Sequence, residues 1–314
     1  MTAAASRAAV PRQLGARHWR RVLRRVGRHV LSDHLPLLSA GIAFFAVLSI
    51  APVLVTAVSV YSAVNSPEQA LEQLRELAGM LPPQLEPLVA DQLTVITDAS
   101  AQVLTRRGLT GLVLALWTAT TAATYLVDAL TLAYHEAETR SFLRRSALAL
   151  LLVLGGALLV GAVIVAGRHV SGVVDASPGP VRAVAPALAW VALGLVMSAA
   201  LAVLYRCAPD RKQARWCWTS WGATTATVLW LLTSAGLFAY VQRATYESTY
   251  GSLSGVAISM LWVWISVFLV VVGAAVNAEA ERQTVRDSTV GPEQPLGERG
   301  AVVADSAPPY AGEA

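Results

Sequence analysis

Long apolar runs, separated by short charged segments, dominate the hydropathy pattern of this chain. Six runs contain almost no charge, at about residues 35–64, 109–134, 146–166, 184–204, 219–241 and 246–281. A helix rises about 1.5 Å per residue, so about 20 apolar residues cross a hydrocarbon core of about 30 Å. The runs are longer than the roughly 10-residue alternating strands of membrane barrels. The pattern therefore predicts an all-α polytopic membrane protein with six transmembrane helices.

The last run, residues 246–281, has the clearest start and stop. It begins with polar residues and glycines, crosses an uncharged stretch, and ends at Asn277, Glu279 and Glu281. Ser252 is placed to cap the helix start, and anion binding by free N–H groups there is the alternative. Within the run, Trp262 and Trp264 are two residues apart and so point to different faces, which excludes a single pore lined by both.

The first 34 residues combine arginines with an apolar stripe. The arginines are Arg7, Arg12, Arg17, Arg20, Arg21, Arg24, Arg25 and Arg28. The apolar positions are Trp19, Val22, Leu23, Val26 and Val30, which share one side of a helix. We interpret residues 1–34 as a basic amphipathic arm that lies on an anionic membrane leaflet. The apolar stripe argues against the alternative, a nucleic-acid-binding arm.

Two further segments are polar. The loop 65–107 is acidic and is split by Pro82 and Pro83, and its second half has one apolar helical face. This face predicts an amphipathic helix that rests on the outer membrane surface or caps a cavity. Residues 283–314 are polar, with scattered proline and glycine, and predict a disordered tail. The expected domains are the arm 1–34, a membrane domain 35–282 and the tail 283–314.

Composition and charge placement agree with a membrane protein. The chain is 55% hydrophobic and only 14% charged, against about 25% charged residues in soluble domains. Arginine-rich segments precede the first run and follow the second and fourth. The positive-inside rule then predicts cytoplasmic termini in a bacterial inner membrane, although Arg106 and Arg107 run against it. Cys207 and Cys217 fall in a basic cytoplasmic segment, so we expect free thiols.

Motifs for enzyme chemistry are not apparent in the sequence. The histidines, His18, His29, His34, His135 and His169, lack the spacing of a zinc motif. The chain has no phosphate-binding loop of the G-x-x-x-x-G-K-[ST] type and no G-x-S-x-G nucleophile elbow. We therefore expect no metal, no cofactor and no enzymatic activity.

Polar residues inside the runs are the candidates for a substrate path. They are Ser39, Pro52, Thr121, Thr124, Asp128, Ser252 and Asn277. Thr121, Thr124 and Asp128 lie on one helical face, and a carboxylate near hydrocarbon usually faces water or a bundle interior. The alternative is that Asp128 is structural and hydrogen-bonded near the inner interface. Pro52 is expected to kink its helix, as a hinge or as fixed shape.

Three segments carry a family resemblance: SAGIAFFAVLSIAP, LYRCAPDRK and YGSLSGVAISMLWVWISVFLVVVGAAVNAE. Over about residues 25–285 the chain resembles the YihY/BrkB family of bacterial inner-membrane proteins, formerly labelled ribonuclease BN. The resemblance implies six transmembrane helices and, for some relatives, transport of a lipid or envelope component. Its motif residues here are Pro209, Tyr250, Gly251, Gly255 and Gly273. The chain departs from the family at Ala275, where an acidic residue is common. If the family's activity uses that carboxylate, this chain either lacks it or replaces it with Asp128 or Glu279.

Together these features predict a transporter or flippase for a lipid-like or envelope-related substrate. The expected cavity is lined by the first, second and sixth spans, with Asp128 and Asn277 as a polar pair near its inner end. The expected partners are membrane lipids and a lipid-like or small-molecule substrate, without nucleic acid, and a homo-oligomer is compatible with the sequence. The alternatives are a membrane scaffold for envelope or division proteins and a membrane-bound nuclease, which would need a metal.

Overall fold

Six long helices make up most of the part of the chain that the structure describes. The computed structural model describes residues 6, 8–62, 101–175, 179–243, 254–308 and 310. The long helices are α2 (Leu35–Ser62), α5 (Ala101–Ala133), α6 (Phe142–Asp175), α7 (Gly179–Cys207), α8 (Trp216–Arg243) and α10 (Ser254–Glu281). Each contains a stretch that is long and apolar enough to cross a membrane. The prediction of an all-α protein with six transmembrane helices is confirmed.

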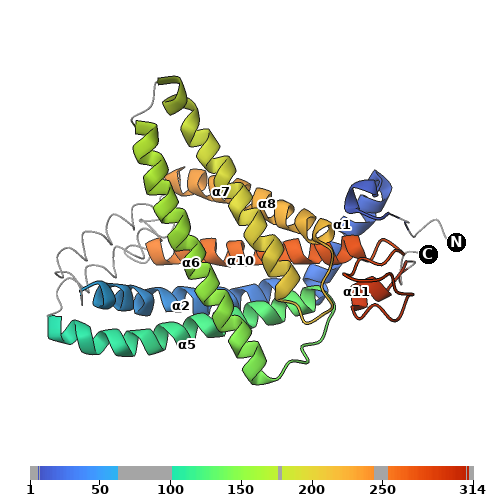
Figure 1. Cartoon of the computed structure of the whole chain (residues 1–314), viewed down its shortest axis with the longest axis horizontal. Helices are drawn as coiled ribbons and strands as arrows, with labels where there is room; N and C mark the ends of the chain where they lie inside the picture. The colour runs from blue at the N-terminus through green and yellow to red at the C-terminus, as the bar shows by residue number, and fades with distance from the viewer. Residues whose placement is uncertain are drawn as a thin grey trace.

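Helix α10 occupies the centre of the arrangement. It packs against α2, α5 and α8, and at its end against α1 (Ala16–Ser32) and α11 (Val302–Asp305). Helices α2 and α5 run side by side, and α1 and α11 lie at the same end of α10 (Figure 1). A short 3-10 helix, η1 (Pro11–Gln13), precedes α1. The chain segments farthest apart in sequence thus meet at one end of the bundle.

Helices α8 and α10 approach each other closely because glycines face each other. A Cβ atom added to Gly222 of α8 would overlap with the carbonyl of Gly273 in α10. The Asn277 side chain joins the same pair of helices: its Oδ1 accepts from Gly222 N at 2.6 Å, and its Nδ2 donates to Thr219 O at 3.0 Å. Small residues at a helix contact allow such close backbone packing. The motif residue Gly273 therefore has a direct packing role.

The two tryptophans of α10 point to different neighbours, as expected from their spacing. Trp262 Nε1 donates to Ser234 Oγ of α8 at 3.1 Å, whereas Trp264 Nε1 donates to the Pro36 carbonyl of α2 at 3.0 Å. These side chains tie α10 to both flanking helices within the apolar region. They are packing residues, and the prediction that they point to different faces is confirmed.

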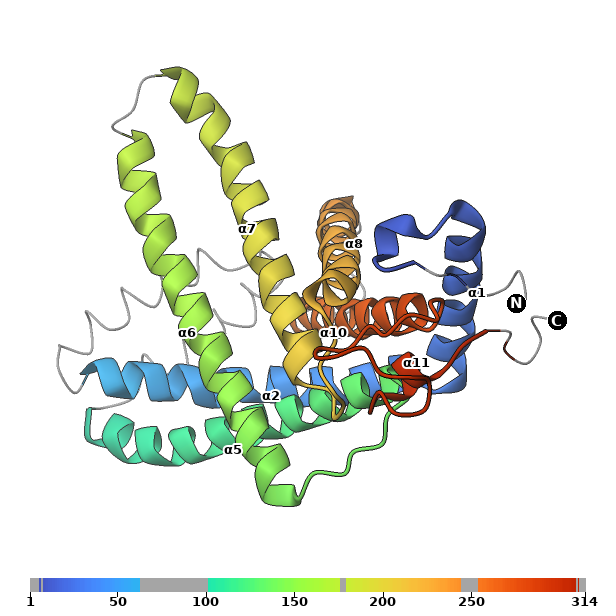
Figure 2. The same cartoon turned by 45° about the vertical axis from the view of Figure 1, so that its right-hand side comes forward.

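The α6–α7 hairpin leans away from the other helices (Figure 2). Its contact with the bundle is made by α6 on α5 and by α7 on α8. Large apolar side chains are exposed along both helices, including Leu151, Leu154, Leu158, Leu188 and Leu195. Exposed apolar surface on a membrane-spanning helix is what contact with lipid tails or another membrane helix requires.

The apolar stripe of α1 packs on protein, which corrects our interpretation of a helix lying on lipid. Val22, Val26 and Val30 are buried, and the helix lies against α10. Leu23, which we had included in the stripe, is exposed. Arg25 and His29 belong to the buried face instead. A pattern of apolar residues alone could not show this, because Arg25 pairs with Glu279 and His29 packs against the His135 ring, and both of these residues are far away in the sequence.

The segment after α10 folds back over the end of that helix, so the disorder prediction is wrong for residues 283–308. Its polar side chains satisfy one another: Asp287 Oδ1 accepts from Thr289 N at 2.8 Å, and Arg299 Nη1 donates to Ala304 O at 2.8 Å. Asp305 accepts from the backbone N–H groups of Gly297, Arg299 and Gly300. A polar composition resembles that of disordered segments, but here the polar groups form a hydrogen-bonded loop.

Some predictions fall outside the described residues. The amphipathic helix expected in the second half of the loop 65–107 lies largely within residues 63–100, and residues 101–107 form the first turns of α5. Tyr250, Gly251 and Ser252 also lie outside, so capping by Ser252 stays a prediction. Gly255 is in the first turn of α10.

Candidate functional site

A stripe of polar side chains follows one face of α5 toward the end of that helix. Thr121, Thr124, Tyr125 and Asp128 form this polar stripe, and all are at least partly exposed. The Thr121 hydroxyl donates to Trp117 O at 2.7 Å, and the Thr124 hydroxyl donates to Thr120 O at 2.8 Å. Because the threonines satisfy their own donors, they present a polar surface without needing a partner helix.

Asp128 ends the polar stripe and pairs with a cation from the next helix. Arg145 Nη1, in the second turn of α6, lies 3.2 Å from Asp128 Oδ1. The side chains keep 34% and 28% of their exposure, so neither charge is sealed inside protein. Sequence reasoning treated Arg145 only as a topology charge. Arg145 lies at the start of the next span, at the same end of the membrane as Asp128, and this position could have predicted the pair.

Asn277 does not join Asp128, so the expected polar pair is not formed. Both ends of the Asn277 amide are occupied by α8, and the residue is buried. The other candidates also have local roles: Ser39 donates to Leu35 O, and Thr56 donates to Pro52 O within α2. The motif residue Pro209 accepts from Arg211 N in the α7–α8 loop. Among the predicted path residues that the structure describes, which exclude Ser252, those on α5 share one surface.

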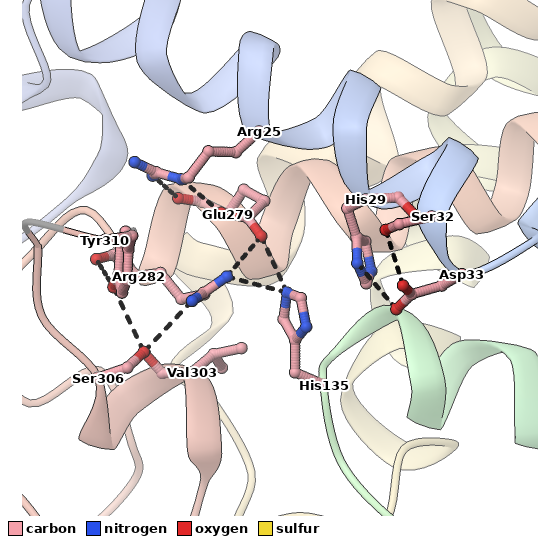
Figure 3. Close-up of polar contacts among 10 residues, drawn as sticks. All are labelled: Arg25, His29, Ser32, Asp33, His135, Glu279, Arg282, Val303, Ser306 and Tyr310. Atoms are coloured by element: carbon pink, nitrogen blue, oxygen red, sulfur yellow. Dashed lines mark hydrogen bonds and ion pairs between the residues drawn. The ribbon is translucent and has the colours of Figure 1, made fainter. Parts of the chain in front are cut away.

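Glu279, near the end of α10, is the centre of a buried charge cluster that the sequence did not reveal. Its carboxylate accepts from Arg25 Nε at 2.6 Å and from Arg282 Nη1 at 2.8 Å (Figure 3). His135 Nε2 lies 2.9 Å from the same carboxylate and 3.1 Å from Arg282 Nη1. Tyr310 lies under the Arg282 guanidinium at 4.1 Å. These contacts join α1, the end of α5, α10 and the C-terminal segment at one carboxylate.

Glu281 forms a second buried cluster two residues later. Arg211 grips its carboxylate with two hydrogen bonds, of 2.6 and 3.0 Å, and the Ser288 hydroxyl also donates to it. Although burial alone would lower it, the adjacent Glu281 carboxylate raises the pKa of Arg211. Burial raises the pKa of the Tyr134 phenol, whose ring lies 5.0 Å from the guanidinium. Both groups therefore keep their ordinary charge states.

Ala275 and Glu279 are one helical turn apart on α10, and both are fully buried. The family resemblance led us to expect a carboxylate at position 275. This chain has alanine there, and Glu279 places a carboxylate one turn away on the same face of α10. Of the two replacements considered, Glu279 lies on the same helix, whereas Asp128 is on α5. The carboxylate of Glu279 is fully occupied by its partners, so its role is to hold the surrounding segments together.

Comparison with known proteins agrees with this architecture. The profile described as virulence factor BrkB matches residues 26–297. This chain belongs to that family. The ribonuclease-like protein YfkH of Bacillus subtilis is 28% identical over 76% of this chain and 88% of its own length. The membrane protein Rru_A2625 of Rhodospirillum rubrum is 28% identical over 85% of this chain and 63% of its own length.

A third bacterial relative, the membrane protein RSc1559 of Ralstonia nicotianae, is 29% identical over 82% of this chain and 57% of its own length. Rru_A2625 and RSc1559 are both named UPF0761 membrane proteins, and this chain spans less than two thirds of the length of each. No solved structure matches. The chain is thus an integral, multi-pass membrane protein with bacterial relatives, and its activity has to be argued from its own residues.

Proposed function

We propose that this protein moves a lipid-like or envelope-related molecule across the bacterial inner membrane along the polar stripe of α5. One observation supports this most: the Asp128–Arg145 pair stays partly exposed at the end of a membrane span. A charge facing hydrocarbon is costly, so such a pair needs water or a polar headgroup beside it. A molecule with a polar head and apolar tails meets that need.

The surroundings of the pair suit such a substrate. The carboxylate and the guanidinium offer opposite charges to a zwitterionic or anionic headgroup, and Thr121 and Thr124 continue the polar surface along α5. On neighbouring α6, Leu151, Leu154 and Leu158 are exposed and would contact acyl chains. The proposed path is thus open to lipid on one side.

The distribution of arginine supports a cytoplasmic position for both termini. Arg17, Arg20, Arg24 and Arg28 are exposed on α1, at the same end as the α5–α6 and α7–α8 loops. Positive residues are retained on the cytoplasmic side during insertion. The Asp128–Arg145 pair then lies at the cytoplasmic end of the path, where a substrate made in the cytoplasm would enter.

Reconstitution into proteoliposomes that contain a head-labelled fluorescent phospholipid tests the proposal. Wild-type protein should increase the fraction of label that an external reductant quenches, and Asp128→Asn and Arg145→Gln should each reduce the rate at least about tenfold. Asp210→Asn, which alters an ion pair at the same end but outside the stripe, is the matched control. Equal rates for wild type and Asp128→Asn would contradict the proposal, as would no activity of wild type toward any tested lipid.

The alternative, a scaffold for envelope or division proteins, is favoured by the arginine-rich exposed face of α1. Deleting residues 1–30 would not test it, because Arg25 holds Glu279 and its loss would disturb the fold. Reversing two exposed charges, Arg20→Glu with Arg24→Glu, leaves the buried face intact. A scaffold predicts that this variant loses its bound partner proteins in affinity purification, while lipid movement is unchanged.

A further inference from the structure

His29, Asp33 and His135 come together where α1 meets the end of α5. Each offers one nitrogen or oxygen atom, and these atoms lie within 4.8 Å of one another. The two imidazole rings have centroids 4.1 Å apart (Figure 3). Zinc–ligand bonds of about 2.0–2.1 Å place tetrahedral ligand atoms about 3.4 Å apart. A small side-chain movement would therefore close the three groups around one ion.

Glu279 prepares His135 to act as a ligand. The Glu279 carboxylate accepts from two arginines, so it is ionised. His135 Nε2 lies 2.9 Å from this carboxylate and 3.1 Å from Arg282 Nη1, so Nε2 donates to Glu279 in one tautomer and accepts from Arg282 in the other. The first tautomer leaves the lone pair on Nδ1, and this is the form that could bind an ion. A carboxylate that holds the outer N–H of a ligating histidine is the usual support of a metal site.

His29 carries the second indication. His29 is 6% exposed, and its Nε2 is buried without a hydrogen bond of ordinary geometry, although the Ala133 backbone lies close to the ring. Its Nδ1 lies 3.1 Å from Asp33 Oδ2, and Asp33, at the end of α1, is partly exposed. A buried polar atom without a partner destabilises a fold, so its presence calls for an explanation. The exposed side of Asp33 gives an ion a route into the site.

The backbone at His135 is consistent with a need for an imidazole at this position. His135 has φ of 58°, and the helix closes with Glu136 N donating to Thr131 O at 3.0 Å. Glycine usually occupies this left-handed position after a helix, because other residues pay about 1–2 kcal/mol there. The chain keeps a histidine where glycine would be less strained.

We propose that His29, Asp33 and His135 bind a divalent transition-metal ion of the zinc class that links α1 to the end of α5. Two imidazoles and one carboxylate favour this class over Ca²⁺ or Mg²⁺, which prefer oxygen ligands alone. The inference goes beyond the proposed function and does not depend on it. Our sequence-based prediction of no metal used spacing along the chain, whereas the fold brings His135 to α1 from another helix.

The test uses the full chain, purified in detergent without a histidine tag and stripped with a chelator. Zn²⁺ titration by calorimetry should show one saturable site per chain, and Co²⁺ should give the visible absorption of a four-coordinate site with nitrogen and oxygen ligands. Asp33→Asn and His135→Gln should each weaken Zn²⁺ binding at least about tenfold. The matched control is His18→Gln, on the same helix but away from the cluster, and it should bind as wild type does.

Thermal unfolding separates binding from folding. Zn²⁺ should raise the Tm of wild type and of His18→Gln, and should leave the Tm of Asp33→Asn unchanged. Asp33 is partly exposed, so we expect Asp33→Asn to fold. This variant therefore still tests metal binding if His135→Gln fails to fold. Absence of a saturable site in wild type, wild-type affinity in Asp33→Asn, or an equal loss in His18→Gln would each overturn the proposal.

Discussion

Two carboxylate–arginine pairs at the same end of the helix bundle have very different surroundings. Glu281 and Arg211 are 1% and 2% exposed and make two short hydrogen bonds. Asp128 and Arg145 are about one third exposed and are joined by a single 3.2 Å contact. The first pair is surrounded by Tyr134, Ser288 and the loops that they belong to, whereas the second faces the surface beside α6.

The difference indicates different reasons for keeping each charge. A buried pair has lost its hydration, and only its close geometry offsets that cost, so removing one partner leaves an uncompensated charge. A half-exposed pair contributes little to stability, typically about 0–1 kcal/mol. Stability therefore accounts for Glu281 and Arg211, while Asp128 and Arg145 need another explanation, which the proposed lipid path supplies.

The largest expected effect is at the buried pair. Glu281→Ala leaves Arg211 buried without its partner, and we expect a loss of about 3–5 kcal/mol, seen as little folded protein in size-exclusion chromatography. Glu281→Gln retains the side-chain size and one acceptor, so it should give an intermediate yield. A normal yield and Tm for Glu281→Ala would show that the cluster is not what joins α10 to the α7–α8 loop.

Gly222→Ala tests whether close helix packing contributes as much to stability near this end of α10 as the charge cluster does. The added methyl group would overlap with the Gly273 carbonyl, so the helices must separate, at an expected cost of about 1–3 kcal/mol. Gly236→Ala, also in α8, is the control, because nothing lies within 4 Å of its added Cβ. The Tm of the two variants in detergent makes the comparison. An equal Tm for both variants would show that the contact between Gly222 and Gly273 does not contribute to stability.

The sequence predicted the membrane helices well because their signal is local. An uncharged run of sufficient length has few alternatives to a spanning helix, and the last run, expected over residues 246–281, ends at Glu281 as α10 does. Asn277 was identified as a special polar residue, but its partner was not, since no sequence signal marks the backbone N–H of Gly222 as the donor to its side-chain oxygen. The position of a polar residue could be predicted, and its role could not.

The charge clusters were missed for a related reason. Arg25 lies among several arginines, and its burial follows only from the position of Glu279 far along the chain. In the same way, the polar C-terminal segment makes long-range contacts, such as the hydrogen bond from the Thr284 hydroxyl to the Ala8 carbonyl. Long-range pairing of this kind leaves no periodic pattern, so hydropathy and charge counts cannot predict it.

At the half-exposed pair the expected effect on stability is small. Asp128→Asn and Arg145→Gln, alone and combined, should give a coupling free energy below about 1 kcal/mol in a double-mutant cycle of thermal unfolding. The same variants should lose lipid movement in proteoliposomes. A coupling of about 3 kcal/mol or more would place this pair with Glu281 and Arg211, and the contrast between the two regions would disappear.

The smallest expected effect is a pH dependence at Asp210, which pins the α5–α6 loop to the loop after α7. Burial would raise the pKa of Asp210, but hydrogen bonds from Thr139 and the charge of Arg140 outweigh it and lower that pKa. A lowered folded-state pKa stabilises fully above the unfolded value of 3.8, and the contribution is lost as the pH falls through the folded value. The Tm difference between wild type and Asp210→Asn should thus be largest near neutral pH and shrink in acid. A Tm difference that stays constant down to about pH 3 would mean that Asp210 acts through its shape and not through its charge. The surface ion pair would then contribute no measurable stability to this end of the bundle.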